Sequence, residues 1–156
     1  MMAIPDPFDL QRFVAAQADI YQEALGEIRD GRKRTHWMWF IFPQLAGLGM
    51  SPTSQHYGIT GLREAAAYLS HSLLGPRLIE CSEAVTLVAG RSARDIFGSP
   101  DDMKLRSSAT LFSRVTDANP VFRRILEQYF DGQLDPRTIA LLGDVMSRDG
   151  TEERPS

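Results

Sequence analysis

The sequence predicts an all-α protein of seven or eight short helices arranged around a central aromatic helix. Apolar residues recur in steps of three and four, the spacing of one helical face. Several segments begin with a capping side chain followed by proline, the residue pair that starts helices. No run alternates apolar and polar residues as a half-buried strand does. The 156 residues are 43% hydrophobic and 24% charged, which is typical of one globular domain.

The first half of the chain contains two predicted helices of different character. One follows Asp9, carries an apolar stripe from Leu10 to Ile28 and ends at Gly31. The other is a two-turn helix capped by Thr35 that stops before Pro43. Because this second helix is apolar on every side except at His36, we expect it to be buried at the centre of the fold.

Further helices are predicted from their start and stop signals. One begins after Thr60, one has Pro76 in its first turn, and a short one begins with the capping box Ser92-Ala-Arg-Asp95. Ser99-Pro100, Asn119-Pro120 and Asp135-Pro136 predict helices over 100–116, 120–131 and 136–142. The last of these ends at Gly143, so we assign residues 1–143 to one helical domain and 144–156 to a flexible tail.

Composition excludes several classes of protein. The net charge of −3 makes a nucleic-acid role unlikely on electrostatic grounds, and no apolar run is long enough to span a membrane. Cys81 is the single cysteine, so no internal disulfide forms, and no Cys or His spacing indicates zinc. We therefore expect a cytoplasmic protein with no metal and no cofactor, and the sequence leaves its oligomeric state open.

Residues 32–57 are the most unusual segment, because aromatic residues there lead into a polar loop. The aromatic run taken alone indicates core packing. An apolar wall beside a polar loop is also how ligand pockets are built. As a pocket, Trp37, Trp39 or Tyr57 would stack a ring. Hydroxyl groups of a ligand would bind Gln44, Ser54, Gln55 and His56.

Four further polar residues are candidates for the same pocket. Gln17 lies within the apolar stripe of the first helix and must be hydrogen-bonded internally, since an unpaired buried amide costs about 1–3 kcal/mol. Lys104 either reaches past its helix end to solvent or points into a pocket, where Arg106 would help it to hold phosphate. His36 is either a core histidine or a pocket donor. Lys33 belongs to a basic cluster that is either a solvated connection or an anion site.

Three strings carry a resemblance to a known family: GRKRTHWMWFIFPQLAGLGMSPTSQHYGI, LGPRLIEC and IFGSPDDMKLRSSATLF. The chain resembles the bacterial family called domain of unknown function 1810, some members of which are labelled calpastatin. The resemblance runs from about Phe8 to Gly143. It implies a small, mainly helical cytoplasmic protein and no particular activity.

The order of SPTSQHY and DDMKLRSS is also similar to the YbiA-like, or NADAR, proteins, which act on or bind ADP-ribose-type compounds. Their usual Ser-Glu-His-Tyr is Ser54-Gln55-His56-Tyr57 here. An amide cannot replace the carboxylate that N-glycosidic cleavage uses. If cleavage occurs, Asp101 or Asp102 would supply the carboxylate, with His56 as the third catalytic candidate.

Two functional hypotheses follow from these residues. The first is a pocket protein for an ADP-ribose-like, nucleotide or sugar-phosphate ligand, which it binds or hydrolyses as an N-glycosidase. The second is a non-enzymatic protein-interaction module that docks a partner on an exposed helical face. Convergence of the polar candidates on one cavity would favour the first hypothesis, and a large exposed apolar patch would favour the second.

Overall fold

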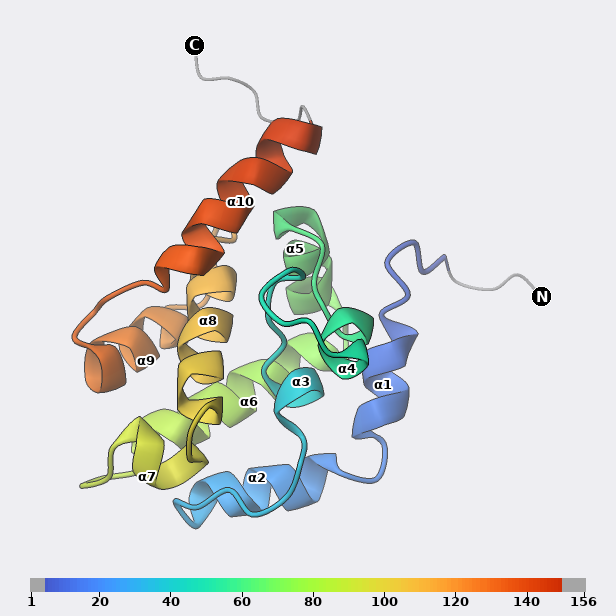
Figure 1. Cartoon of the computed structure of the whole chain (residues 1–156). Helices are drawn as coiled ribbons and strands as arrows, with labels where there is room; N and C mark the ends of the chain where they lie inside the picture. The colour runs from blue at the N-terminus through green and yellow to red at the C-terminus, as the bar shows by residue number, and fades with distance from the viewer. Residues whose placement is uncertain (1–4, 150–156) are drawn as a thin grey trace.

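The computed structural model describes residues 5–149, in which ten helices pack around one core (Figure 1). In chain order they are α1 (Gln11–Gln17), α2 (Tyr21–Arg29), α3 (Met38–Ile41), α4 (Pro52–His56), α5 (Leu62–Ser70), α6 (Leu74–Leu87), α7 (Ala93–Phe97), α8 (Asp101–Ser113), α9 (Val121–Phe130) and α10 (Pro136–Asp149). Within this range there is no β-strand, only an isolated bridge between Leu45 and Ile59. The all-α prediction is therefore confirmed.

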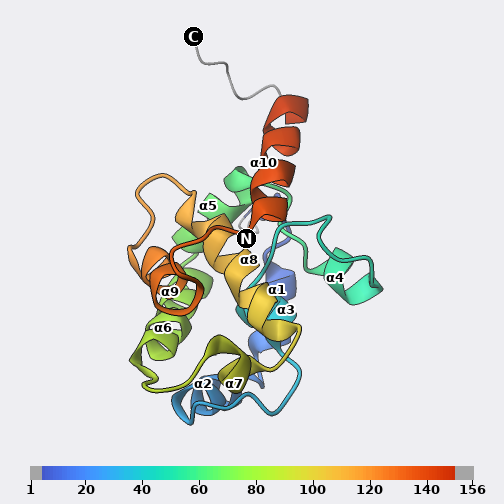
Figure 2. The same ribbon diagram turned by 60° about the vertical axis from the view of Figure 1, so that its left-hand side comes forward.

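The centre of the fold is α8, not the aromatic segment. Helix α8 packs against α5, α7, α9 and α10, and its residues from Ser107 to Phe112 are all buried (Figure 2). The predicted two-turn aromatic helix is a single turn, α3, because Thr35 does not cap it and instead donates its hydroxyl to Glu27 Oε2 (2.8 Å). Trp37, Met38, Ile41 and Phe42 are buried as expected, whereas Trp39 and Phe40 are partly exposed.

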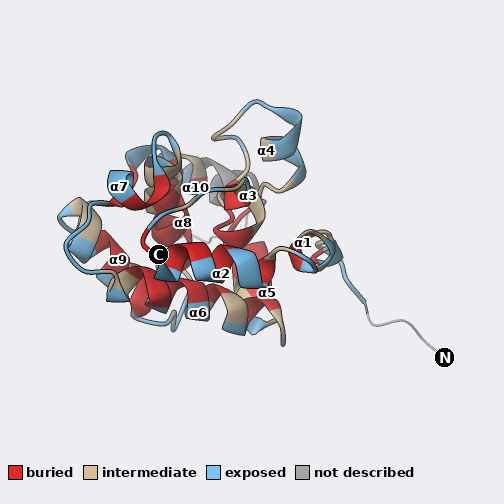
Figure 3. Cartoon of the chain, turned by 90° about the horizontal axis from the view of Figure 1, so that it is seen from below, coloured by how far each residue is buried: buried red, intermediate tan, exposed pale blue. Residues whose placement is uncertain are grey.

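The stripe predicted as one helix over 10–28 is divided into α1 and α2. The chain turns at residues 18–20 because the two halves of the stripe have different neighbours: α1 packs on α3 and α2 packs on α6. Buried residues gather where α2, α6, α8 and α9 meet, whereas α4 contains none (Figure 3).

Two of the predicted caps at helix starts are confirmed, and two others are wrong. Ser92 forms the capping box of α7, and Asp135 Oδ2 accepts from the amide of Thr138 at the start of α10 (3.0 Å). Ser99 and Thr60 do not cap: α8 follows Pro100 without a side-chain cap, and Thr60 donates to Glu64 instead.

The last helix is longer than predicted. Helix α10 passes through Gly143 and reaches Asp149, because glycine in a helix costs only about 1 kcal/mol relative to alanine and does not by itself end it. Residues 150–156 of the predicted tail lie outside the described residues. No helix in the described part of the chain combines the length and apolarity needed to cross a membrane.

Candidate functional site

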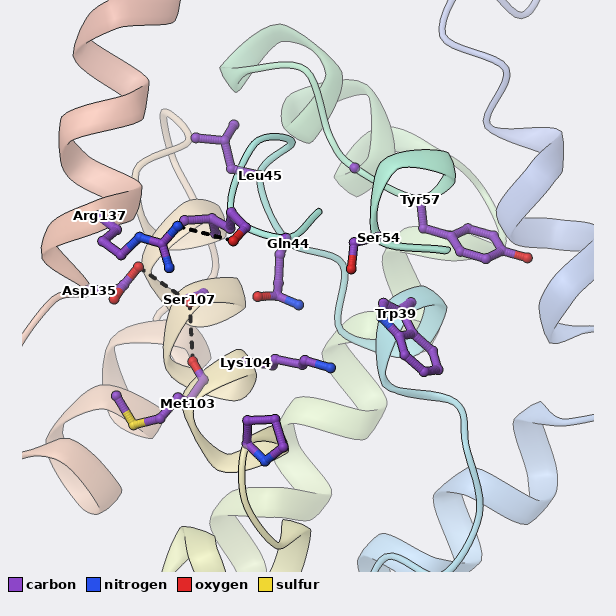
Figure 4. A pocket seen from close by; sticks show the side chains of 14 residues that line it. Trp39, Gln44, Leu45, Ser54, Tyr57, Met103, Lys104, Ser107, Asp135 and Arg137 are labelled. Atoms are coloured by element: carbon purple, nitrogen blue, oxygen red, sulfur yellow. Dashed lines mark hydrogen bonds between the residues drawn. The ribbon is translucent and has the colours of Figure 1, made fainter. Parts of the chain in front are cut away.

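A pocket of about 350 Å³ opens between α3, the loop that follows it, α8 and the start of α10. Figure 4 shows Lys104, Gln44 and Ser54 around one space, with Trp39 on one side and Arg137 on the other. The lining is completed by both apolar and polar residues: Leu45, Leu48, Gly49, Tyr57, Gly58, Pro100, Met103, Ser107 and Asp135. Five predicted site residues therefore meet here, namely Trp39, Gln44, Ser54, Tyr57 and Lys104.

The loop over residues 44–59 is closed by hydrogen bonds at its base. The amide of Ala46 donates to Ile59 O (2.8 Å), and that of Ile59 donates to Gln44 O (2.9 Å). Ser51 caps α4 by accepting from the amide of Ser54 (3.1 Å). A Cβ on Gly49 would lie 2.6 Å from Ser54 Oγ, so glycine permits the close approach that forms this wall. The loop is thus a built structure that presents Gln44 and Ser54.

Arg12 of α1 secures the far end of the same loop. Its guanidinium donates to His56 O (2.8 Å) and Gly58 O (3.0 Å) and pairs with Glu64 (2.8 Å), whose side chain is 1% exposed. A buried carboxylate of this kind requires a paired cation. Sequence reasoning missed Arg12, because nothing in its local pattern indicates a partner 52 residues away.

Lys104 points into the pocket, which answers the alternative that the sequence left open. Its Nζ lies 4.7 Å from the ring centroid of Trp39 and 3.4 Å from Asp101 Oδ1. The side chain remains 24% exposed. The ion pair is long and partly exposed to solvent, so it compensates the ammonium charge only weakly. An anion entering the pocket would meet this cation.

Asp101 is shared between two lysines. Its Oδ2 forms a short ion pair with Lys33 Nζ (2.9 Å), and the Lys33 side chain is 7% exposed. Lys33 Nζ also donates to Thr35 O (2.6 Å) and lies 5.0 Å from the ring centroid of Trp37. Asp101 is therefore engaged with Lys33 first and Lys104 second. It is adjacent to the pocket but does not line it.

Two polar groups on the pocket wall lack protein partners. Trp39 Nε1 is buried and has no hydrogen-bond acceptor among residues 5–143. The side-chain amide of Gln44 makes no hydrogen bond within the same range, although its backbone carbonyl is bonded. An unpaired buried donor costs about 1–3 kcal/mol. That cost falls on Trp39 Nε1, which is closed to solvent, whereas the half-buried Gln44 amide is the group that a ligand in the pocket can contact.

The start of α10 closes the pocket opposite Trp39. Asp135 is buried, and its Oδ2 also accepts from Thr138 Oγ1 (2.5 Å) and from Ser107 Oγ (3.3 Å). Arg137, one residue into the helix, is exposed and donates Nη2 to Leu48 O (3.1 Å). Sequence reasoning placed Ser107 or Ser108 beside Lys104 in a pocket, and Ser107 does line it, but it used Asp135 only as a helix cap and did not consider Arg137. The capping position of Asp135 was the available signal, because it fixes where α10 begins and therefore where Arg137 lies.

Each of the aromatic candidates already has neighbours at its ring. Trp37 is fully buried and donates Nε1 to Glu27 Oε1 (2.9 Å). The Trp39 ring has the Lys104 ammonium over it. Tyr57 packs against Phe13, Phe40 and His56 (centroids 5.7, 5.5 and 4.6 Å apart) and projects away from the cavity (Figure 4).

Glu27 explains why Trp37 is structural. Its carboxylate accepts from the amides of Arg34 (2.8 Å) and Thr35 (3.1 Å), from the Thr35 hydroxyl and from Trp37 Nε1. Burial raises the pKa of Glu27, but these four donors outweigh it and hold the pKa below the ordinary glutamate value. The basic segment over 32–35 is thereby ordered around a buried carboxylate.

The remaining predicted site residues do not reach the pocket. Gln17 is fully engaged, donating to Phe40 O (2.7 Å) and Tyr68 Oη (3.2 Å) and accepting from Arg77 (3.2 Å), so its predicted internal bonding is confirmed. Arg106 donates to Gln133 O and Leu134 O and holds the segment before α10. Four others lie outside the lining: His36, Gln55, His56 and Asp102.

The convergence that the N-glycosidase hypothesis requires is thus incomplete. Of Gln17, His36, Gln55, His56 and Lys104, only Lys104 lines the pocket. Asp101 contacts Lys104 from outside the lining. Across residues 5–149, no group of three or more His, Cys, Asp or Glu side chains could hold a metal ion. Cys81 is buried, which raises the pKa of its thiol to about 12.

Comparison with known proteins agrees with this architecture. A family model described as "Protein of unknown function (DUF1810)" matches residues 7–142. The crystal structure of the conserved hypothetical protein Rv1873 from Mycobacterium tuberculosis is 60% identical, with a TM-score of 0.87 over 88% of this chain and 99% of that one. No curated protein matches the chain.

Proposed function

Since the chain belongs to the DUF1810 family, whose description gives no activity, we propose a function from the pocket itself: binding of a small, hydroxyl-bearing anion of the sugar-phosphate class. The observation that carries the proposal is the group of under-used polar atoms on one wall. Lys104 Nζ has a weak ion pair, the Gln44 amide has no partner within residues 5–143, and the Ser54 hydroxyl lines the same space. A cation beside two hydrogen-bonding groups is suited to a phosphoryl group with neighbouring hydroxyls.

Size favours a sugar phosphate over ADP-ribose. A cavity of about 350 Å³ lies at the lower end of the range for small-molecule pockets, so it suits a sugar phosphate better than a dinucleotide. The Trp39 ring already carries the Lys104 ammonium, and Tyr57 packs against Phe13 and Phe40, so neither ring is fully open to a bound base.

We propose binding without cleavage. N-glycosidic cleavage requires a carboxylate that can act as a base or stabilise an oxocarbenium ion. Asp101 is shared between two ammonium groups outside the lining, and Asp135 has one oxygen committed to the start of α10. His56 and Asp102 lie away from the cavity.

Binding is tested by calorimetric titration of the full chain with ribose 5-phosphate, AMP, ADP-ribose and NAD. We expect saturable binding of ribose 5-phosphate, at least tenfold weaker binding of ADP-ribose, and loss of binding in Lys104→Gln. Arg123→Gln is the matched control, because Arg123 is an exposed cation on α9 and loses the same charge. Ribose 5-phosphate binding that is equal in Lys104→Gln and Arg123→Gln would refute the proposal.

Cleavage is tested separately by incubating the chain with NAD and ADP-ribose and measuring release of nicotinamide or free base. We expect no release above that of a heat-inactivated sample. Release that Asp101→Asn abolishes would restore the N-glycosidase hypothesis.

The interaction-module alternative has no comparable support in the described residues. The large apolar side chains that are exposed there come from four separate segments: Met50, Leu87, Met103 and Leu134. Met103 belongs to the pocket lining. They do not form the single apolar helix face that docking would use.

A further inference from the structure

We infer that the ligand carries two anionic groups, one held by Lys104 of α8 and the other by Arg137 of α10. This inference rests on the proposed function and deepens it by naming a bisphosphorylated sugar, or a compound of equivalent charge, as the preferred class. The two cations line the same cavity from different helices, and Figure 4 shows them on different sides of it.

The first cation is weakly compensated on the side that faces the cavity. Asp101 makes its short contact with Lys33 (2.9 Å), and its contact with Lys104 is longer (3.4 Å). The nearby Trp39 ring attracts a cation but does not neutralise it. A phosphoryl oxygen would therefore gain a direct ammonium contact without first breaking a short ion pair.

The second cation has no carboxylate partner among residues 5–143, whose side chains the structure describes. Arg137 uses one nitrogen, Nη2, to donate to Leu48 O, and within that range its guanidinium forms no other bond. A guanidinium has five N–H groups in a planar fork, so the remaining donors suit a second phosphoryl group. The bond to Leu48 would meanwhile keep the fork directed along the pocket wall.

One carboxylate, that of Asp135, lies in the described lining. Its Oδ2 accepts from the Thr138 amide, the Thr138 hydroxyl and Ser107 Oγ, whereas Oδ1 makes no hydrogen bond within residues 5–143. The three donors and the start of α10 compensate its charge in part, and the two cations of the lining outnumber it. Lys104 and Arg137 remain the groups that an incoming anion would contact.

Ligand binding across these two helices would add a polar link to the packing of α10 on α8. Among the described residues, Arg137 to Leu48 is the side-chain hydrogen bond that joins α10 to the loop over 44–59. An anion bound between Arg137 and Lys104 would join α10 to α8 through charged groups as well. The pocket would then be more rigid with a bis-anion than with a mono-anion.

The test compares ribose 5-phosphate with ribose 1,5-bisphosphate by calorimetric titration of the full chain. We expect the bisphosphate to bind at least tenfold more tightly, since charge-assisted hydrogen bonds are the stronger class. Arg137→Gln should lower bisphosphate affinity by a larger factor than monophosphate affinity, so that the tenfold difference between the two compounds is lost. Arg123→Gln, the exposed control on α9, should preserve the tenfold difference.

The failure of this inference is distinguishable from the failure of the proposed function. Lys104-dependent binding of both compounds with equal affinity, or an equal effect of Arg137→Gln on both, would overturn the second anion site and leave the proposed function standing. If neither compound binds in a Lys104-dependent manner, both proposals are wrong. Circular dichroism of each variant verifies that α10 is retained.

Discussion

The two tryptophans of this chain are separated by a single residue, and they differ in whether their indole N–H groups are hydrogen-bonded. Each has a lysine ammonium near its ring, Lys33 at 5.0 Å from Trp37 and Lys104 at 4.7 Å from Trp39, and Asp101 pairs with both lysines. Trp37 Nε1 donates to the buried carboxylate of Glu27, whereas Trp39 Nε1 has no acceptor in the described part of the chain. The same residue types are therefore structural where every donor is paired and a candidate site where they are not.

This comparison shows why residue type alone does not identify function. A satisfied polar network stabilises one conformation, and an unsatisfied buried donor costs free energy until something binds it. The difference can be tested by changing the two sites in parallel and measuring stability and ligand affinity separately.

The largest expected effect is on the paired site. Glu27→Ala removes the acceptor of four hydrogen bonds and leaves buried donors unpaired, so we expect a loss of about 3 kcal/mol or more in the free energy of unfolding. Urea denaturation measures it, with exposed Glu83→Ala as the control. A loss no greater than that of the control would show that the network contributes little.

The tryptophans themselves should separate stability from binding. Trp37→Phe deletes a hydrogen bond to a buried carboxylate, and we expect a cost of about 1–3 kcal/mol. Trp39→Phe removes a buried donor that has no protein partner, and relief of that cost offsets the packing lost with the smaller ring, so we expect it to destabilise the fold less than Trp37→Phe does. Equal destabilisation by the two substitutions would contradict the distinction.

The lysines should follow the same division on a smaller scale. Lys33→Met loses a short ion pair and a bond to Thr35 O, which we expect to cost about 1–2 kcal/mol. Lys104→Met loses a long, partly exposed pair and the cation beside the Trp39 ring, which we expect to cost less than Lys33→Met does. Thermal denaturation without added anion gives both values, and a reversed order would place the structural role at Lys104.

The smallest effect is on the pH dependence. Because the folded-state pKa of Glu27 is lowered, its ionised form contributes stability that is complete above the unfolded value near 4.5 and is lost as pH falls through the folded pKa. Between pH 5 and pH 3, the wild type should therefore lose more stability than Glu27→Gln. Parallel acid titrations that superimpose would indicate an unperturbed carboxyl group.

Much of the fold was predictable from local signals. The capping box at Ser92 and the cap at Asp135 depend on side chains that bond within one turn, so the sequence contains all the necessary information. The bend between α1 and α2 was not predictable, because it depends on which neighbour each half packs against. Glycine at 143 was misleading for a related reason: it permits a helix end but does not impose one.

The candidate site was predictable only in part, for the same physical reason. Lys104 and Gln44 stand out as polar residues beside apolar segments, and both line the pocket. Arg137 lies 33 residues after Lys104 in sequence and reaches the pocket only because Arg106 and Asp135 place the start of α10 there. The NADAR-like motif residues Gln55 and His56 lie outside the lining, so that resemblance does not identify the pocket's contacts.

Intrinsic fluorescence during titration with ribose 5-phosphate tests the central claim most directly, because the chain contains only two tryptophans. In Trp37→Phe the remaining indole is Trp39, and we predict a saturable change in emission that Lys104→Gln abolishes. In Trp39→Phe the remaining indole is the paired Trp37, and we predict no change. A response confined to Trp37, or one that persists in Lys104→Gln, would contradict the assignment of the ligand to the Trp39–Lys104 wall.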